Sequence, residues 1–424
     1  MSIFSSLYIG MSGMRTHESA IGVIGNNIAN LNTIGYKSSR AVFADMLSHT
    51  VLGTAGQSQT GQGAALAAVQ RMVGQGALLG TNVTTDLAIN GEGYFMATDP
   101  AGGRYYTRNG QLQLDNDGYL TTIDNLKLQG YAASPDGTFA TALSDLRVGE
   151  TTSPPRATTG VAVVANLDRE ADLQTFDVTQ AAATSSHSTT VTVYDSLGAG
   201  HQLEVYFSQN ASGQWEWNAV GTQNDLDGSG DTTPVVLASG NLEFDADGKL
   251  VTETQTLQNI AFANATPQDV LFDFGEELST GGDGSGSTSF ASPSAVSYID
   301  QDGFATGTLS FVEIGTDGTI SGTFTNGQER PLAKLALAKF GAPQALNAIG
   351  GNLFTETQAS GQPAIGEAGT GGRGDILSGS LEQSNVDLTN EFTSLILAQR
   401  GFQASSRTIT TADEMLVETV NLKR

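Results

Sequence analysis

Apolar residues recur at intervals of seven near the amino-terminal end of the chain. One column holds Leu7, Met14, Ile21 and Ile28, and a second column, offset by three positions, includes Ile24 and Leu31. Columns that alternate by three and four residues are typical of a helix whose apolar seam packs against another helix. Asn, Thr and Gly interrupt the pattern over residues 30–35, where they favour a turn. We therefore predict a helix from the start of the chain to about this segment.

The carboxyl-terminal end carries the same pattern in a cleaner form. The residues spaced by seven are Leu388, Leu395, Phe402, Ile409 and Leu416, and the stripe is widened by Phe392. Asp387 or Thr389 is suited to cap the start of a helix, and Glu391 places an acidic group in its first turn. A helix over residues 385–422 would be ~55 Å long at a rise of 1.5 Å per residue. Such a length is unusual for a surface helix of a small domain.

Each predicted helix needs the other, and further helices as well, to bury its apolar seam. The first contains Gly10, Gly13, Gly22 and Gly25, each of which costs up to about 1 kcal/mol relative to alanine in a helix interior. Such a helix is marginal on its own, so its seam must be buried against a partner, and the second helix offers a matching seam. Parts of both stripes stay exposed after this pairing. We therefore expect the seam residues named above to pack between copies of the chain.

The middle of the chain has the pattern of β-structure. Prolines occur only from Pro100 to Pro363, and the strand-like segments are residues 85–99, 104–121, 189–209 and 318–340. In these segments alternating apolar and polar residues are separated by turns such as Asn109-Gly110 and Asp117-Gly118. The predicted fold class is mainly β with α, in which the two terminal helices pair as a coiled-coil-like layer.

The order helix, β, different β, β, helix predicts nested, discontinuous domains. Pro154-Pro155 and the Gly-rich tracts at residues 281–287 and 359–374 are the candidate linkers. The predicted domains are a terminal helical domain with its linkers (residues 1–70 and 361–424), an inner β-domain (71–148 and 296–360) and an inserted outer β-domain (149–295).

Composition excludes several classes of function. The 424 residues include 44 Asp+Glu and 19 Lys+Arg, a formal net charge of −25, which disfavours binding to nucleic acids or to anionic membrane surfaces. No apolar run is long enough to predict a membrane-spanning helix. Because the chain has no cysteine, disulfides and thiolate chemistry are excluded. We find no nucleophile or phosphate-loop motif, so we predict a non-enzyme without a cofactor.

Three features could carry chemistry, and for each we favour a structural interpretation. Asp225, Asp227, Ser229 and Gly230 match the first positions of an EF-hand loop, but Val236 replaces the final Glu and no helical pattern flanks the segment. We expect an acidic β-turn there, and calcium binding over residues 225–231 stays open. His17 lies in the helical seam and is expected to pack. Trp215 and Trp217 alternate along a strand, so both rings should pack on one face.

Long segments of the chain resemble the bacterial flagellar rod and hook axial protein family, and its hook branch in particular. Residues 26–40 (NNIANLNTIGYKSSR) resemble the family signature, with Asn26, Asn27, Asn30, Gly35 and Tyr36 as the signature residues. Residues 384–424 are similar to the family's carboxyl-terminal helix. Residues 190–207 resemble the outer domain of hook subunits, and residues 326–354 resemble their returning β-segment.

The resemblance implies a structural subunit that self-assembles into a curved hollow tube, the universal joint that transmits torque from motor to filament. It implies terminal helices in an inner tube, β-domains outside, an extracellular position at the cell surface and export by the flagellar type III apparatus. Phe4 and Tyr8 match a short export motif of such subunits. The implied partners are further copies of the chain, the hook cap, distal rod and hook–filament junction proteins, and the export gate.

Two other functions stay open at this point. A distal rod protein shares both ends, but is shorter and lacks the region of residues 190–207. A secreted calcium-binding adhesin would use the acidic turn at residues 225–231. Cross-linking of subunits through a cysteine, which some members of the family perform, is excluded because this chain has none.

Overall fold

The computed structural model describes residues 3–46, 49–53, 56–134, 136–149, 152–256 and 259–422. The chain divides into two compact units. The first unit comprises residues 1–150, 311–323 and 329–424, and the second comprises residues 151–310 and 324–328. The second unit is therefore inserted into the first along the sequence. The finer, three-part division expected from the sequence stays a prediction.

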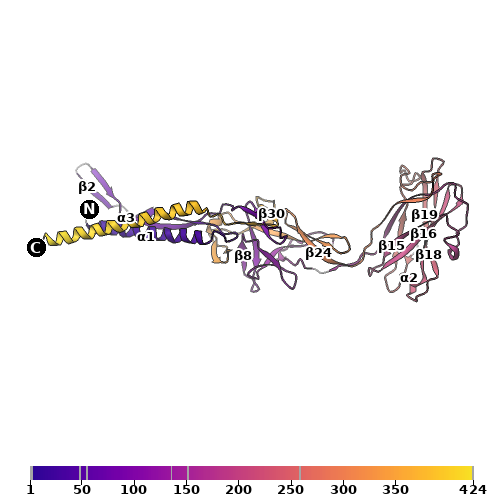
Figure 1. The fold of residues 1–424 in the computed structure, drawn as a ribbon, viewed down its shortest axis with the longest axis horizontal. Helices are drawn as coiled ribbons and strands as arrows, with labels where there is room; N and C mark the ends of the chain where they lie inside the picture. Colours follow the sequence, from indigo (N-terminus) through magenta and orange to yellow (C-terminus); the bar gives the residue numbers. More distant parts are fainter. Residues whose placement is uncertain are drawn as a thin grey trace. The chain divides into compact units, whose positions relative to one another are not determined.

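The first unit contains two long helices, as predicted. Helix α1 (Ile3–Ala29) and helix α3 (Leu388–Asn421) lie side by side and are drawn in indigo and yellow in Figure 1. Asp387 caps α3, because its carboxylate accepts hydrogen bonds from the backbone N–H of Thr389 at 2.9 Å and of Asn390 at 3.2 Å. Of the two candidate caps, Asp387 is thus the one used.

A β-ribbon covers one side of α1, and the sequence patterns did not predict most of it. Strand β1 (Ser39–Asp45) pairs antiparallel with β4 (Ala64–Arg71), and β2 (His49–Gly53) pairs with β3 (Gly56–Thr60). The backbone N–H of Ala64 donates to Ser12 Oγ of α1 at 3.3 Å.

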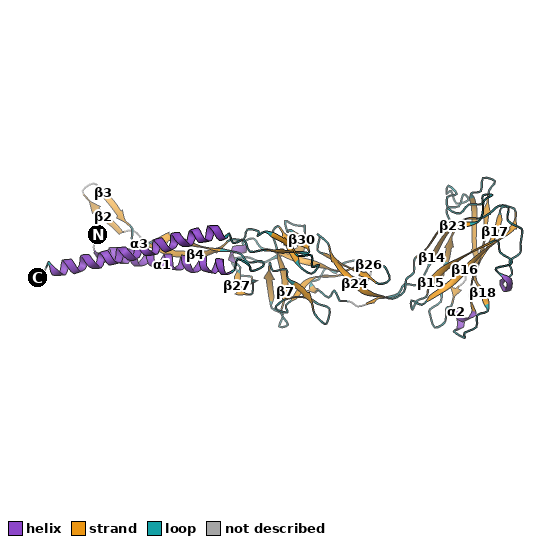
Figure 2. Cartoon of the chain, viewed as in Figure 1, coloured by secondary structure: helices purple, strands orange, loops and turns teal. Residues whose placement is uncertain are grey.

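The rest of the first unit is a small antiparallel β-body, shown with its strands in orange in Figure 2. The central sheet runs in the order β25 (Thr319–Phe324), β26 (Glu329–Lys339), β11 (Lys127–Ala132), β7 (Tyr94–Thr98), β8 (Arg104–Thr107), β28 (Leu353–Thr355) and β27 (Asn347–Gly350). The peripheral strands are β9 (Leu112–Leu114), β10 (Leu120–Thr122), β12 (Ser144–Asp145) and β29 (Ala364–Glu367). Two further pairs lead toward the helices: β6 (Leu87–Asn90) with β30 (Asp375–Ser378), and β5 (Leu78–Gly80) with β31 (Ser380–Glu382).

The core of this β-body is apolar and closed. Phe95, Leu128, Leu335 and Leu337 are fully buried, and they come from strands that are far apart in the sequence. The segment after β26 includes a short 3₁₀-helix (Pro343–Ala345). Strand pairing between β11 and β26 joins the outgoing and returning parts of the chain.

The second unit is a two-layer β-structure. Its larger sheet runs β15 (His187–Tyr194), β16 (Gly200–Ala211), β17 (Gln214–Thr222), β18 (Pro234–Phe244) and β19 (Leu250–Thr256), all antiparallel. Its smaller sheet runs β22 (Leu271–Asp273), β14 (Gly160–Asn166) and β23 (Ala295–Gln301), in which β14 and β22 are parallel. Short elements complete it: β13 (Thr152–Ser153), a 3₁₀-helix (Val178–Gln180), α2 (Gln223–Asp227), β20 (Asn259–Ile260) and β21 (Gln268–Asp269). Strand β24 (Gly307–Ile314) begins in this unit and ends in the first.

One aromatic core joins the two sheets of the second unit. Trp215 and Trp217 are fully buried, and the ring of Trp217 lies 4.9 Å from that of Phe272 and 5.1 Å from that of Phe274. The expectation that both tryptophans pack on one face of a strand is confirmed. Burial between two sheets is what an alternating strand of this composition favours.

Candidate functional site: the terminal helix pair and its junction

Helices α1 and α3 run antiparallel and approach closely at glycines. A Cβ atom added to Gly10 would lie 2.8 Å from Ile409 Cγ1, and one added to Gly13 would lie 2.7 Å from Ser405 Oγ. Farther along, the imidazole of His17 packs against Gly401, as its seam position predicted. The glycines therefore permit backbone approach that any larger residue would oppose.

The seam residues that were expected to pack between copies are only partly covered by the intrachain pairing. The half-buried ones are Leu7, Met14, Ile21, Ile24, Ile28, Leu31, Leu395, Ile409 and Leu416. Three others on α3 are more open: Leu388 is 40% exposed, Phe392 48% and Phe402 37%. Their packing between copies stays a prediction, but apolar surface of this extent on two helices is a feature of interaction faces.

Further apolar residues outside the seven-residue columns are exposed on the same helices. Ile396 is 56% exposed and Leu397 67%, and Phe4 and Tyr8 at the start of α1 are 64% and 63% exposed. The column pattern missed Ile396 and Leu397 because they lie beside the seam rather than in it. Their signal in the sequence is the unbroken apolar run from Leu395 to Ala398, which is wider than a seam of one residue per turn requires.

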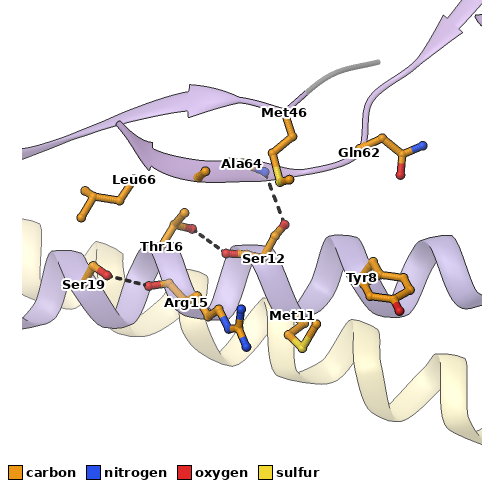
Figure 3. Close-up of a pocket in the computed structure, with 11 residues that line it drawn as sticks. Tyr8, Met11, Ser12, Arg15, Thr16, Ser19, Met46, Gln62, Ala64 and Leu66 are labelled. Atoms are coloured by element: carbon orange, nitrogen blue, oxygen red, sulfur yellow. Dashed lines mark hydrogen bonds between the residues drawn. The ribbon is translucent and has the colours of Figure 1, made fainter. Parts of the chain in front are cut away.

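A groove of about 500 Å³ lies between α1 and the β1–β4 ribbon. Figure 3 shows Ser12 and Thr16 on the side of α1 that faces the ribbon, and Met46 reaching from the ribbon toward the helix. Much of its lining is apolar, with Met46 45% exposed and Leu66 39% exposed. The groove is thus an open, largely apolar surface on the outer side of the helix pair.

The signature residues gather where α1 meets the rest of the first unit. Asn27 is 1% exposed, and its amide donates to the Ser39 carbonyl at 2.7 Å and to Glu391 Oε1 at 3.0 Å. Its side-chain oxygen accepts from the Ser39 N–H at 2.9 Å and from the Tyr36 hydroxyl at 3.3 Å. One side chain therefore ties the end of α1 to the first strand and to the first turn of α3.

The other signature residues support the same junction. The Asn26 amide donates to the Tyr36 hydroxyl at 3.1 Å, and the Asn30 amide donates to the Asn26 carbonyl at 2.9 Å, which closes the end of α1. Gly35 has a φ of 71°, and its N–H donates to the Glu382 carbonyl at 2.7 Å. A Cβ atom at Gly35 would lie 2.8 Å from the Arg108 backbone, so only glycine fits this turn without displacement.

A buried charge cluster lies under this junction, and sequence reasoning missed it. Lys37 Nζ lies 2.5 Å from Glu382 Oε1, and Arg108 lies 2.9 Å from Glu382 Oε2, with the Glu382 side chain fully buried. Lys37 also donates to the Gly74 carbonyl at 2.8 Å, and Arg108 donates to the Gly91 carbonyl at 2.6 Å. The cluster joins three segments that are remote in sequence, so no local pattern could have indicated it.

The electrostatics of the cluster keep Glu382 ionised. Burial alone would raise the pKa of Glu382, but the Arg108 and Lys37 cations and the Gly76 N–H outweigh it and hold this pKa below its ordinary value. Burial also lowers the pKa of Lys37, although the Glu382 carboxylate opposes that shift. Removing one partner of such a group would leave an uncompensated buried charge.

The acidic segment at residues 225–231 begins in a helical turn, which ends at Asp227, rather than in the β-turn we expected. Helix α2 (Gln223–Asp227) begins with a capping box between Thr222 and Asp225, in which Asp225 Oδ2 accepts from the Thr222 N–H at 2.8 Å and from its hydroxyl at 2.6 Å. The expectation of a β-turn was wrong because this capping box stabilises a single helical turn. The other oxygen of Asp225 lies 2.9 Å from His201 Nδ1.

The described residues also bear on two other kinds of site. No group of three His, Asp or Glu residues among them is arranged to hold a metal ion. No helix in the described part of the chain combines the length and the apolar character that crossing a membrane requires.

Four family descriptions match successive parts of the chain. They are the flagella basal body rod protein (residues 7–37), the flagellar hook protein FlgE/F/G D1 domain (88–165), the flagellar basal body protein FlaE D2 domain (165–304) and the flagellar basal body rod FlgEFG protein C-terminal (377–422). The matches thus follow the chain from its first helix to its last.

Individual relatives are similar over nearly the whole length. The flagellar hook protein FlgE of Borreliella burgdorferi is 35% identical over 99% of this chain and 99% of its own length. That of Escherichia coli is 33% identical over 97% of this chain and 98% of its own. The crystal structure of Helicobacter pylori flagellar hook protein FlgE2 is 17% identical, covers 72% of this chain and 100% of its own, and superposes with a TM-score of 0.49.

Proposed function

Because the chain belongs to the family of flagellar hook proteins FlgE, we propose that its terminal helices are the surface through which copies of it polymerise. The protein is a structural subunit of the bacterial flagellar hook and not an enzyme. Its full-length similarity to hook proteins favours this function over that of a distal rod protein or a calcium-binding adhesin.

The observation that carries the proposal is the apolar surface left open on α1 and α3. The helix pair buries small residues such as Ala20, Ala398 and Ala412, while Phe392 and Leu397 stay 48% and 67% exposed. A helix pair that buries its small residues and exposes its large ones has its main apolar area available for further helices. Neighbouring copies supply such helices in a polymer.

We propose that the helix pair forms a coiled-coil-like inner layer of a tube, with the β-domains outside it. In this arrangement the predicted three-part division applies: residues 1–70 and 361–424 form the inner layer, residues 71–148 and 296–360 surround it, and residues 149–295 form the outermost part. The buried Lys37–Arg108–Glu382 cluster supports the proposal, because it joins the segments next to the helices to the β-body. Separating one of its ion pairs would leave a buried charge uncompensated.

Export and further partners follow the family. We propose an extracellular position at the cell surface, export through the flagellar type III gate, and contacts with the hook cap, distal rod and hook–filament junction proteins. Phe4 and Tyr8 are the proposed export motif, and their exposure leaves both rings accessible to a receptor. Leu7, which lies between these two residues, is part of the proposed packing surface, so export would precede packing.

Aspartate substitutions on α3 test the assembly role. Leu395→Asp and Ile409→Asp each place a charge in the seam, so we expect loss of polymer while the β-body of the first unit and the second unit stay folded. Leu397→Asp adds a charge at a side chain that is 67% exposed and should also block polymers, without disturbing the intrachain pair. Electron microscopy of purified protein shows whether polymers form. Circular dichroism reports whether the β-body and the second unit stay folded.

Gln399→Asp is the matched control, because it adds the same charge at an exposed polar position of the same helix. Normal polymers from the Leu397→Asp chain would contradict the proposal. If the β-body or the second unit unfolds in the Leu395→Asp chain, α3 must instead be part of the folded core of one copy.

A further inference from the structure

The end of α3 extends beyond the described part of α1. Gly10 lies opposite Ile409 and Gly13 opposite Ser405, so each step forward along α1 is matched by a step back along α3. By this register Ile3 lies opposite about position 415. The last described turns of α3 therefore have no partner on α1 among the described residues, and Val417 and Val420 are 54% and 67% exposed.

One face of this overhang combines apolar and acidic side chains. Met415, Glu418 and Leu422 are spaced at i, i+3 and i+7, which places them on one side of the helix. Met415 is 55% exposed and Leu422 84%, and the Glu418 side chain is exposed as well. In the part of the chain that the structure describes, the Glu418 carboxylate forms no ion pair.

The groove between α1 and the β1–β4 ribbon offers the complementary face. Tyr8, Met11 and Arg15 line it with the same i, i+3, i+7 spacing, and Leu66 of the ribbon adds apolar surface (Figure 3). Arg15 is exposed, and its guanidinium has no carboxylate partner among the described residues. On a chain of net charge −25, an exposed cation that lines an apolar groove and has no carboxylate partner among the described residues favours a helix that brings a carboxylate with it.

We infer that the end of α3 from one copy, Met415 to Leu422, seats in the α1–β4 groove of a second copy, with Glu418 of the first paired to Arg15 of the second. Met415 and Leu422 are about 10 Å apart along the helix at 1.5 Å per residue. The α1 part of the groove spans residues 8–19, or about 16 Å on the same rise. The overhang therefore fits the groove in length, in apolar character and in charge.

The occupant must come from another copy. Within one chain Arg15 lies between the positions opposite Ser405 and Gly401, because Gly13 and His17 contact those residues. Glu418 lies about 22 Å farther along α3 at 1.5 Å per residue. This inference rests on the proposed polymerisation through the helices and names one contact within it.

Engineered cysteines test the contact, because the natural chain has no cysteine to react with them. An R15C chain and an E418C chain are mixed with an equal amount of unmodified chain, so that polymers form even if a variant assembles poorly alone. A disulfide needs Cα atoms within about 7 Å, so it cannot join these positions inside one chain. We expect disulfide-linked dimers in oxidised polymers, with the 15–418 link identified by mass spectrometry, and none in dilute monomer.

D413C replaces E418C in the matched control, since Asp413 is an exposed carboxylate of the same helix on a different face. Polymers that form without the 15–418 link would overturn the inference while leaving the proposed function intact. Equal linking of R15C to D413C would also overturn it, because the groove would then not bind one particular face of α3. If the unmodified chain forms no polymer, the proposed function fails and this inference fails with it.

Charge exchange provides the second test. Arg15→Glu and Glu418→Arg should each raise the protein concentration needed for polymerisation by about fivefold, the factor that an exposed ion pair supplies. The chain with both substitutions should return close to the unmodified value, since the pair is restored with its charges exchanged. A double variant that assembles no better than the worse single variant would exclude this pairing.

Discussion

The β17 strand of the second unit and the α3 helix of the first are both rich in large apolar residues, yet they are buried to opposite extents. Trp215 and Trp217 of β17 are fully buried, whereas Leu397 and Val420 of α3 are each 67% exposed. The strand is the central strand of one sheet, and its inner face packs against a second sheet of the same unit. The helix has one partner helix and a narrow ribbon nearby, so most of its apolar surface stays open.

The difference teaches that the number of layers within one copy decides where apolar residues are buried. A two-layer sheet structure encloses an inner face completely, so the second unit has its core within a single chain. Two paired helices cover only one side of each other, and further layers must come from outside. The first unit thus combines a closed β-body with an incomplete helical layer.

Equal truncations in the two regions should have very unequal effects on the single copy. Trp217→Ala is expected to destabilise the second unit by about 3–5 kcal/mol, because it empties the centre of a closed core. Leu397→Ala should change the stability of the monomer by less than about 0.5 kcal/mol. Denaturant titration followed by tryptophan fluorescence reports the second unit alone, since Trp215 is the tryptophan that remains, and circular dichroism reports the helices.

The comparison would break if both truncations cost the same in dilute monomer. A large effect of Leu397→Ala there would mean that a single copy covers this side chain. In the polymer, by contrast, Leu397→Ala should raise the concentration required for assembly.

Acidification should act with opposite sign on the two units. Burial raises the pKa of Glu253 in the second unit to about 7, with Asp273 and Glu277 adding to the rise against the Phe274 N–H. A carboxyl whose folded pKa lies above its unfolded value gives stability below the unfolded value, and this stability is lost as pH rises through the folded pKa. The second unit should therefore become more stable between about pH 7 and pH 5.

In the first unit, Glu382 has its pKa held below the ordinary value, so its contribution is present at neutral pH and is lost as pH falls through the lowered pKa. Hydrogen exchange of peptides from each unit measures both trends in one sample. Glu253→Gln is the control and should flatten the pH response of the second unit only. A second unit that weakens between about pH 7 and pH 5 would contradict the assignment.

Alanine substitutions at two glycines of α1 should separate helix propensity from helix packing. Their effect on stability should be smaller than those of the truncations and of acidification. Gly22 has no atom within 4 Å of an added Cβ, so Gly22→Ala should stabilise α1 by up to about 1 kcal/mol. Gly10→Ala gains the same propensity, but its Cβ would lie 2.8 Å from Ile409 Cγ1, so it should force the helices apart. Circular dichroism during thermal unfolding distinguishes them, and an equal gain from both would mean that α1 and α3 do not pack at Gly10.

Patterns of neighbouring residues predicted the elements that depend on neighbouring residues, namely the two helices, the cap of α3 and the strand that carries the tryptophans. The seven-residue columns indicated both helices, and Asp387 was one of two suitable caps because capping depends on the next three residues. The alternation around Trp215 and Trp217 indicated a strand with a shared buried face. The acidic segment at Asp225 was misread, because a capping box stabilises its helical turn and the pattern of apolar residues does not show it.

The β1–β4 ribbon was largely missed for a related reason. Strand β4 is rich in alanine and most of it is exposed, so its pairing with β1 is not supported by an alternation of buried and exposed residues. The candidate junction shows the same limit, since the sequence marked Asn27 and Gly35 only through resemblance. The hydrogen bonds that give them their roles appeared with the structure.

The sequence by itself determined that the chain has two amphipathic ends around a β-rich middle, because helix and strand periodicity are properties of neighbouring residues. Only the tertiary structure decided that Lys37, Arg108 and Glu382 share one buried site, and that Arg15 lines a groove between α1 and the ribbon. Such juxtapositions depend on how distant segments pack, and packing energy is set by the whole fold rather than by any short stretch of the chain.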